Sequence, residues 1–180
     1  LIPFAKQVGV LQKIEAKIVF SELSRFIIVK DYTAGVNYLN QCMLQKNKAT
    51  WSEAPLAYMN YLWGARLHYL NNDPNGALDY LLQVQDNEKN MRAAMFIGYR
   101  FLFLLCHYKL RNFQFLHYAT SSIYKNLKKL DKLYMPEKAL LKFVQDSSDF
   151  DKVKTELRKL YTTFCELETD PYNKPFFEFG

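Results

Sequence analysis

One short pattern occurs four times along this chain and constrains its fold more than any other feature. Each copy starts with a polar residue and then an aromatic residue or proline, and residues of one helix face follow four, eight and eleven positions later. The copies start at Asp31, Asp73, Asn112 and Asp149, so the steps between them are 42, 39 and 37 residues. Such a period is typical of stacked helical hairpins, since a single hairpin cannot bury its own apolar face. The pattern therefore predicts a repeat fold, which builds a binding surface more often than an active site.

Composition and charge agree with a globular helical chain. The 180 residues fit one domain, 1–180, with a sizeable core. Hydrophobic residues make up 49% of the chain, with only 6 glycines and 6 prolines. The net charge of +6 comes mostly from residues 91–180, which hold 15 Lys and Arg against 10 Asp and Glu. A basic excess suits an acidic partner or nucleic acid, although it is also common in proteins that bind neither.

Cysteine usage favours a cytoplasmic setting. The three cysteines are far apart and each lies in an apolar helical stretch, so we expect free, buried thiols and no disulfide. No signal peptide is recognisable, and the most apolar run, from Met95 to Tyr108, is too short to span a bilayer. Because the chain starts at Leu1 and not at methionine, we expect it to be part of a longer protein.

Apolar residues at helical spacing, separated by short polar breaks, predict eight helices and no strands. Their expected ranges are about 5–29, 33–45, 53–70, 75–86, 90–110, 114–130, 136–146 and 151–167. Thr33 is the expected N-cap of the second helix. The predicted fold class is therefore all-α.

The hairpin of the third and fourth helices resembles a tetratricopeptide (TPR) repeat. Ala65 and Ala77 fall at the small positions of that family, and Leu81 and Val84 at large apolar ones. The other hairpins are similar but looser, and their periods exceed the 34 residues of the family. The tail at 170–174 is also similar to endings seen in uncharacterised bacterial TPR-like proteins. The resemblance implies a right-handed TPR-like α-solenoid of about four hairpins.

In TPR-like proteins the first helix of each hairpin lines a concave groove, which implies a set of groove positions here. They are Met59, Leu62, Arg66, Tyr69, Leu70, Gly98, Phe101, Leu105, Tyr108, Lys109, Lys138 and Lys142. Tyrosine and arginine dominate binding hot spots, and lysines in a groove hold carboxylates. The partner-binding residues that we predict are Arg66, Tyr69, Phe101, Tyr108, Lys109, Lys138 and Lys142. The alternative is that Leu62, Phe101 and Leu105 are core residues and that the charges only solvate a face.

A second basic feature lies near the end of the sixth predicted helix. Its members share one helix face at spacings of three, four and seven, and they are Lys125, Lys128, Lys129 and Lys132. The helix dipole alone favours cations at a helix C-terminus. The alternative is an electrostatic contact with phosphate or an acidic protein. Without interleaved aromatic residues or arginine, this basic stripe is weak support for nucleic-acid binding.

No catalytic, cofactor-binding or metal-binding residues are predicted. The chain lacks a phosphate-binding glycine loop and the common hydrolase and metalloprotease motifs. His68 and His107 both lie five residues before a repeat start, which favours equivalent packing roles. Cys106 and His107 are adjacent on a helix and do not face each other.

The sequence favours a non-enzymatic scaffold that binds a protein or peptide, with acidic partners among the candidates. Nucleic acid and membrane insertion are disfavoured, and a second copy of the chain is a further candidate partner. Two alternatives remain open. One is a peptide-sensing regulatory domain of a larger bacterial regulator, and the other is a helical enzyme or accessory subunit.

Overall fold

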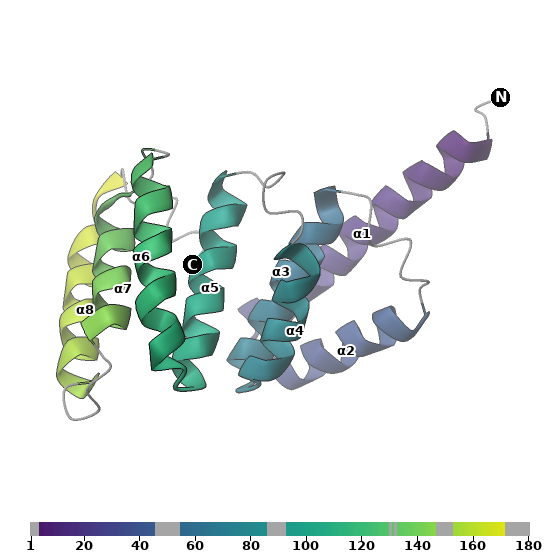
Figure 1. The fold of residues 1–180 in the computed structure, drawn as a ribbon. Coiled ribbons are helices and arrows are strands. Elements are labelled where there is room, and N and C mark those ends of the chain that lie inside the picture. Colours follow the sequence, from purple (N-terminus) through teal and green to yellow (C-terminus); the bar gives the residue numbers. More distant parts are fainter. Residues whose placement is uncertain are drawn as a thin grey trace. The chain divides into compact units, whose positions relative to one another are not determined.

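The computed structural model describes residues 4–45, 55–85, 93–129, 131, 133–146 and 153–171, and within these ranges the chain is all-α (Figure 1). The helices are α1 (Phe4–Ile28), α2 (Tyr32–Gln45), α3 (Pro55–Leu70), α4 (Pro74–Gln85), α5 (Ala93–Lys109), α6 (Phe113–Lys129), α7 (Met135–Asp146) and α8 (Val153–Glu168). The eight predicted helices are confirmed, with ends that differ by a few residues. The apolar run that begins at Met95 belongs to α5, as expected, and no described helix is long and apolar enough to cross a membrane.

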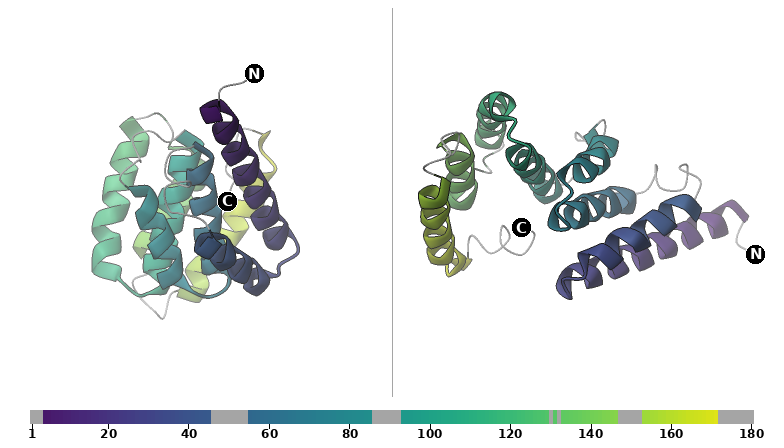
Figure 2. Two further views of the ribbon diagram at one scale, coloured as in Figure 1. Left: turned by 90° about the vertical axis from the view of Figure 1, so that its right-hand side faces the viewer. Right: turned by 90° about the horizontal axis from the view of Figure 1, so that it is seen from below.

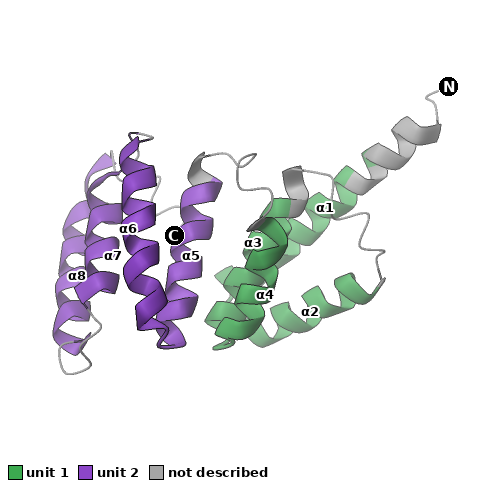
Figure 3. Ribbon diagram, in the orientation of Figure 1, with its two compact units in different colours: residues 1–91 green, residues 92–180 purple. Residues whose placement is uncertain are grey.

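The chain divides into two compact units (Figure 3). Unit 1 is Leu1–Met91 and contains α1 to α4, whereas unit 2 is Arg92–Gly180 and contains α5 to α8. The prediction of a single domain stays a prediction.

The repeat starts share one backbone geometry. In three hairpins the residue before the repeat start has a left-handed backbone, with φ of 59° at Lys30, 64° at Asn72 and 60° at Arg111. The N–H of each described repeat start donates to the carbonyl oxygen five residues earlier. These bonds are Asp31 to Phe26 (3.0 Å), Asp73 to His68 (2.8 Å) and Asn112 to His107 (3.0 Å). Such 6→1 bonds satisfy carbonyls at a helix end. The fourth repeat start, Asp149, lies outside the described residues.

Side chains of the repeat starts also cap the next helix. Asp31 Oδ1 accepts a hydrogen bond from the Ala34 N–H at 3.2 Å, and Asp73 Oδ1 accepts one from the Gly76 N–H at 2.9 Å. The prediction that Thr33 caps the second helix is therefore wrong. Thr33 lies inside α2, and its hydroxyl donates to Asn71 Oδ1 at 2.9 Å. Aspartate at the turn acts as the N-cap because its carboxylate reaches the first free N–H groups of the helix.

In unit 1, small residues let the helices approach closely. α3 packs against α1, α2 and α4, and α1 also packs against α2 (Figure 2). A Cβ added to Gly35 on α2 would lie 2.9 Å from the Cβ of Phe26 on α1 and 2.8 Å from Leu67 Cδ2 on α3. Glycine is therefore required where these three helices meet. Ala65 and Ala77, at the small positions of the TPR resemblance, are fully buried.

Polar side chains add links between α1 and α3. The indole N–H of Trp63 donates to Ser24 Oγ at 2.6 Å, and the Asn60 amide donates to the Ala16 carbonyl at 3.2 Å. The leucine core of this unit includes Leu23, Leu39, Leu67 and Leu81, all fully buried.

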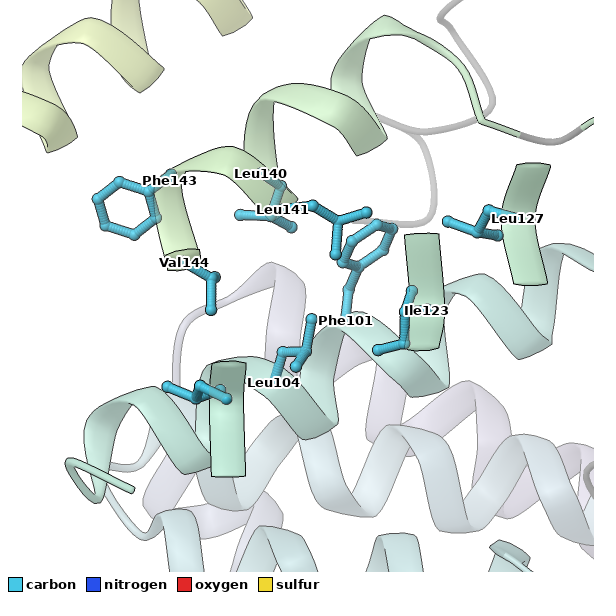
Figure 4. Packing of buried hydrophobic residues seen from close by; sticks show 9 residues of the cluster. Phe101, Leu104, Ile123, Leu127, Leu140, Leu141, Phe143 and Val144 are labelled. Atoms are coloured by element: carbon cyan, nitrogen blue, oxygen red, sulfur yellow. The ribbon is translucent and has the colours of Figure 1, made fainter. Parts of the chain in front are cut away.

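Unit 2 has its own hydrophobic core, which joins three helices (Figure 4). Its buried members are Phe101 and Leu104 of α5, Leu116, Ile123 and Leu127 of α6, and Leu140, Leu141, Phe143 and Val144 of α7. The α6 members lie on one helix face, together with the buried Thr120. α8 packs on α7 and contributes the partly buried Leu160 and Phe164.

The cysteines are free, but they differ in exposure. Cys106 is buried and Cys42 is half-buried, whereas Cys165 is exposed on α8. The expectation that all three are buried is therefore wrong. α8 packs against α7 with one face only, and Cys165 lies on the other side of the helix.

Candidate functional site

A groove of about 320 Å³ lies between α6 and α7 of unit 2. Its described lining residues are Thr120, Ser121, Tyr124 and Lys125 from α6, and Lys138, Leu141, Lys142 and Gln145 from α7. We call this the α6–α7 groove. Its volume is near the lower end of the range for ligand pockets, roughly 300–1,000 Å³. It therefore has room for a short stretch of a partner.

Helical periodicity places these residues on one side of each helix. The four from α7 follow one another at spacings of three, one and three, so they form one stripe along the helix. Leu140, Phe143 and Val144 lie between them in sequence and point into the core. Leu141 is only 4% exposed and belongs to both the core and the groove, where it forms an apolar floor.

The groove is basic. Lys125, Lys138 and Lys142 are all exposed, and none of the described residues that line the groove is acidic. Within the described part of the chain, no ion pair joins these three lysines to a carboxylate. Like charges held around one hollow create a local positive potential, which favours an anionic ligand.

The two small hydroxyls of the groove bond to their own helix. Thr120 Oγ1 donates to the Leu116 carbonyl at 2.7 Å, and Ser121 Oγ donates to the His117 carbonyl at 3.2 Å. Their hydrogens are therefore engaged by the backbone. The lysine ammonium groups remain as the strongest donors for a ligand.

The structure joins two features that the sequence placed on separate surfaces. Lys125 was predicted in the basic stripe, whereas Lys138 and Lys142 were predicted in the concave groove. The short connection between α6 and α7 makes these helices antiparallel neighbours (Figure 1), so the end of α6 lies beside the start of α7. Lys128 and Lys129 are exposed in the last turn of α6 and are not among the described lining residues. Lys132 lies outside the described residues.

Two predicted groove residues, Arg66 and Tyr69, belong to α3 in unit 1. The Arg66 guanidinium lies over the Trp63 ring, 5.4 Å from its centroid, in a cation–π contact. Burial lowers the pKa of Arg66 from its ordinary value. Tyr69 is half-buried, and its carbonyl accepts the Asn72 N–H in the turn that follows. Arg66 is thus half-buried in unit 1, with part of its surface in contact with Trp63.

The other predicted groove residues of α5 lie in unit 2. Phe101 is 6% exposed in the core, so the structure favours its alternative interpretation as a core residue. Tyr108 is half-buried, with its ring 5.5 Å from that of Phe143 and 6.2 Å from that of Phe113. Lys109 is exposed at the end of α5. Tyr108 therefore uses part of its ring for packing.

His68 and His107 occupy equivalent positions in two hairpin turns. His68 Nδ1 lies 2.8 Å from Asp73 Oδ2, and the Asn112 amide nitrogen lies 3.0 Å from His107 Nδ1. The buried Nε2 of His68 has no hydrogen-bond partner among the described residues. Hydrogen bonds from the Gly76 N–H and from His68 lower the pKa of Asp73. Burial lowers the pKa of His107 and so favours its neutral form.

Sequence reasoning missed Thr120, Ser121, Tyr124, Leu141 and Gln145 as groove residues. The sequence shows that these residues share a face on their own helices, but it does not show which helix lies opposite each face. Within the described residues, no group of three or more His, Cys, Asp or Glu side chains is placed to hold a metal ion.

No family model, curated protein or solved structure matches this chain.

Proposed function

We propose that this chain is a non-enzymatic, TPR-like helical-repeat protein that binds an acidic segment of a partner protein in the α6–α7 groove. The observation that carries this proposal is the convergence of Lys125, Lys138 and Lys142 on one hollow with no acidic residue among its described lining. Charges of one sign around a hollow select partners of the opposite sign and speed their association.

The repeated turn supports the TPR-like part of the proposal. Three hairpins share the left-handed residue, the 6→1 bond and the polar repeat start, although their sequences differ. In unit 1, α3 packs against both helices of the preceding hairpin, as expected for stacked hairpins. Repeat folds of this kind present extended surfaces to peptides and proteins.

A peptide titration tests the proposal. The probes are two fluorescein-labelled octapeptides, one of alternating Glu and Ser and one of alternating Lys and Ser, followed by fluorescence polarisation at low and physiological salt. The test variant is Lys125→Gln/Lys138→Gln/Lys142→Gln. The matched control is Lys128→Gln/Lys129→Gln/Lys154→Gln, which removes the same charge from exposed lysines of unit 2 outside the described groove lining.

We expect the acidic peptide to bind and the basic peptide not to bind. The groove variant should lose about tenfold in affinity, because three exposed charge pairs contribute roughly 0.5 kcal/mol each. The control variant should lose much less. Equal losses in the two variants would mean that net charge alone attracts the peptide, and the groove would not be the site.

A further inference from the structure

The two lysines on the α7 wall set a spacing for a ligand in the α6–α7 groove. Lys138 and Lys142 are four residues apart, and a helix rises about 1.5 Å per residue, so they leave α7 about 6 Å apart along its axis. In an extended peptide, residues i and i+2 point to the same side and lie about 7 Å apart. Adjacent residues point to opposite sides. Acidic residues at alternate positions therefore match the two lysines, whereas adjacent ones do not.

The size of the groove favours an extended segment over a helix. Its α7 wall runs from Lys138 to Gln145, which is about 10 Å of helix. A groove of about 320 Å³ over that length is narrow compared with a helix and its side chains, which measure about 10–12 Å across, so an extended chain enters it more deeply than a helix. Three residues of extended chain span about 10 Å and match the length.

Charge is unevenly distributed along the groove. Because α6 and α7 are antiparallel, Lys125 lies toward the same end as Lys138, next to the connection between the two helices. The other end carries the neutral Thr120 and Gln145, and Asp146 follows at the end of α7. One acidic side chain would therefore meet Lys125 and Lys138 together, and a second would meet Lys142 one turn further along.

We propose that the α6–α7 groove recognises an extended segment of a partner protein with acidic side chains at alternate positions. This inference rests on the proposed function and specifies its ligand. The pair of Lys125 and Lys138 binds the first acidic residue, and Lys142 binds the second. The residue between the two acids points away from α7.

Two peptides of identical composition test the spacing. One is Ser-Glu-Ser-Glu-Ser-Ser and the other is Ser-Glu-Glu-Ser-Ser-Ser, both labelled with fluorescein and titrated with the whole protein. The key variant is Lys142→Gln/Gln145→Lys, which keeps the net charge but moves one lysine along α7 by three residues. Lys128→Gln/Lys129→Gln is the control outside the described lining of the groove. A labelled single-stranded oligothymidine of matched charge is the third probe.

We expect the native protein to bind the alternating peptide at least threefold more tightly than the adjacent one. The Lys142→Gln/Gln145→Lys variant should lose this preference while it still binds both peptides, and the control should keep it. Equal affinity of the native protein for both peptides would overturn the spacing rule and leave the proposed function intact. Failure of both peptides to bind would overturn both proposals. If the oligothymidine binds more tightly than either peptide, and if Lys142→Gln weakens that binding, the groove is assigned to phosphate backbones instead.

Discussion

Asp73 connects the two helices of its hairpin through several contacts at once. Its carboxylate meets His68 Nδ1 and the Gly76 N–H, and its own N–H donates to the His68 carbonyl. A Cβ added to Gly76 would collide with the Asp73 carboxylate and the His68 ring, so a larger residue there would displace these two side chains. Asn112 makes the corresponding contact with His107 without a charge. The turn thus uses the same backbone with or without an acidic side chain.

The Asp73 carboxylate should make stability depend on pH in the acid range. Its pKa is lowered in the folded protein, chiefly by the Gly76 hydrogen bond, so the native state favours the charged form. The stabilisation is present above the ordinary pKa of about 3.9 and is lost as pH falls through the lower folded value. Asp73→Asn keeps a capping oxygen but does not titrate. In urea unfolding, the native protein should lose more stability than this variant below about pH 4.

Asp79→Asn is the matched control for this measurement, because Asp79 is an exposed carboxylate of the same helix. It should leave the acid dependence of the native protein unchanged. Identical pH profiles for the native protein and Asp73→Asn would show that the turn carboxylate does not contribute.

At the scale of the helical element, small residues decide how closely the helices pack. Ala77 on α4 is fully buried, and α4 packs on α3, where Ala65 is also fully buried. A methyl group at these positions fills the contact without separating the helices. The same repeat position in α6 holds the larger Leu116, which is also buried. The repeat pattern is therefore a pattern of burial and not of a fixed side-chain size.

Ala77→Leu should overpack the contact between α3 and α4. Three extra carbon atoms in a fully buried position force side chains or helices to move, and the expected destabilisation is about 1–3 kcal/mol. Urea unfolding followed by circular dichroism measures it. Gln83→Leu, at an exposed position of the same helix, is the control and should change stability by less than about 0.5 kcal/mol. An unchanged unfolding midpoint for Ala77→Leu would contradict the repeat alignment.

At the scale of the whole molecule, each unit has a buried core of its own. Unit 1 has a leucine core, and unit 2 has the cluster of α5, α6 and α7 with part of α8. A set of helices that has its own hydrophobic core can fold without the rest of its chain. The α6–α7 groove lies wholly within unit 2.

The fragment 92–180 should therefore fold by itself. We expect a helical circular dichroism spectrum and a cooperative urea transition. The fragment should also bind the alternating peptide Ser-Glu-Ser-Glu-Ser-Ser with the same affinity as the whole chain. The fragment 1–91 is the control, since it should be helical but should not bind this peptide. A fragment 92–180 that is helical but unfolds without a cooperative transition would show that its core is not sufficient.

The sequence by itself determined the eight helices, because helical periodicity, caps and turn residues act over a few neighbouring positions. It also determined which residues share a helix face, including the spacing of Lys138 and Lys142. Only the tertiary structure decided that Lys125 joins them, that Phe101 lies in the core, and that Asp31 rather than Thr33 caps α2. The pattern of residues on one helix face does not specify which other helix packs against that face. That choice depends on how side chains distant in sequence fill the space between helices, which local periodicity does not contain.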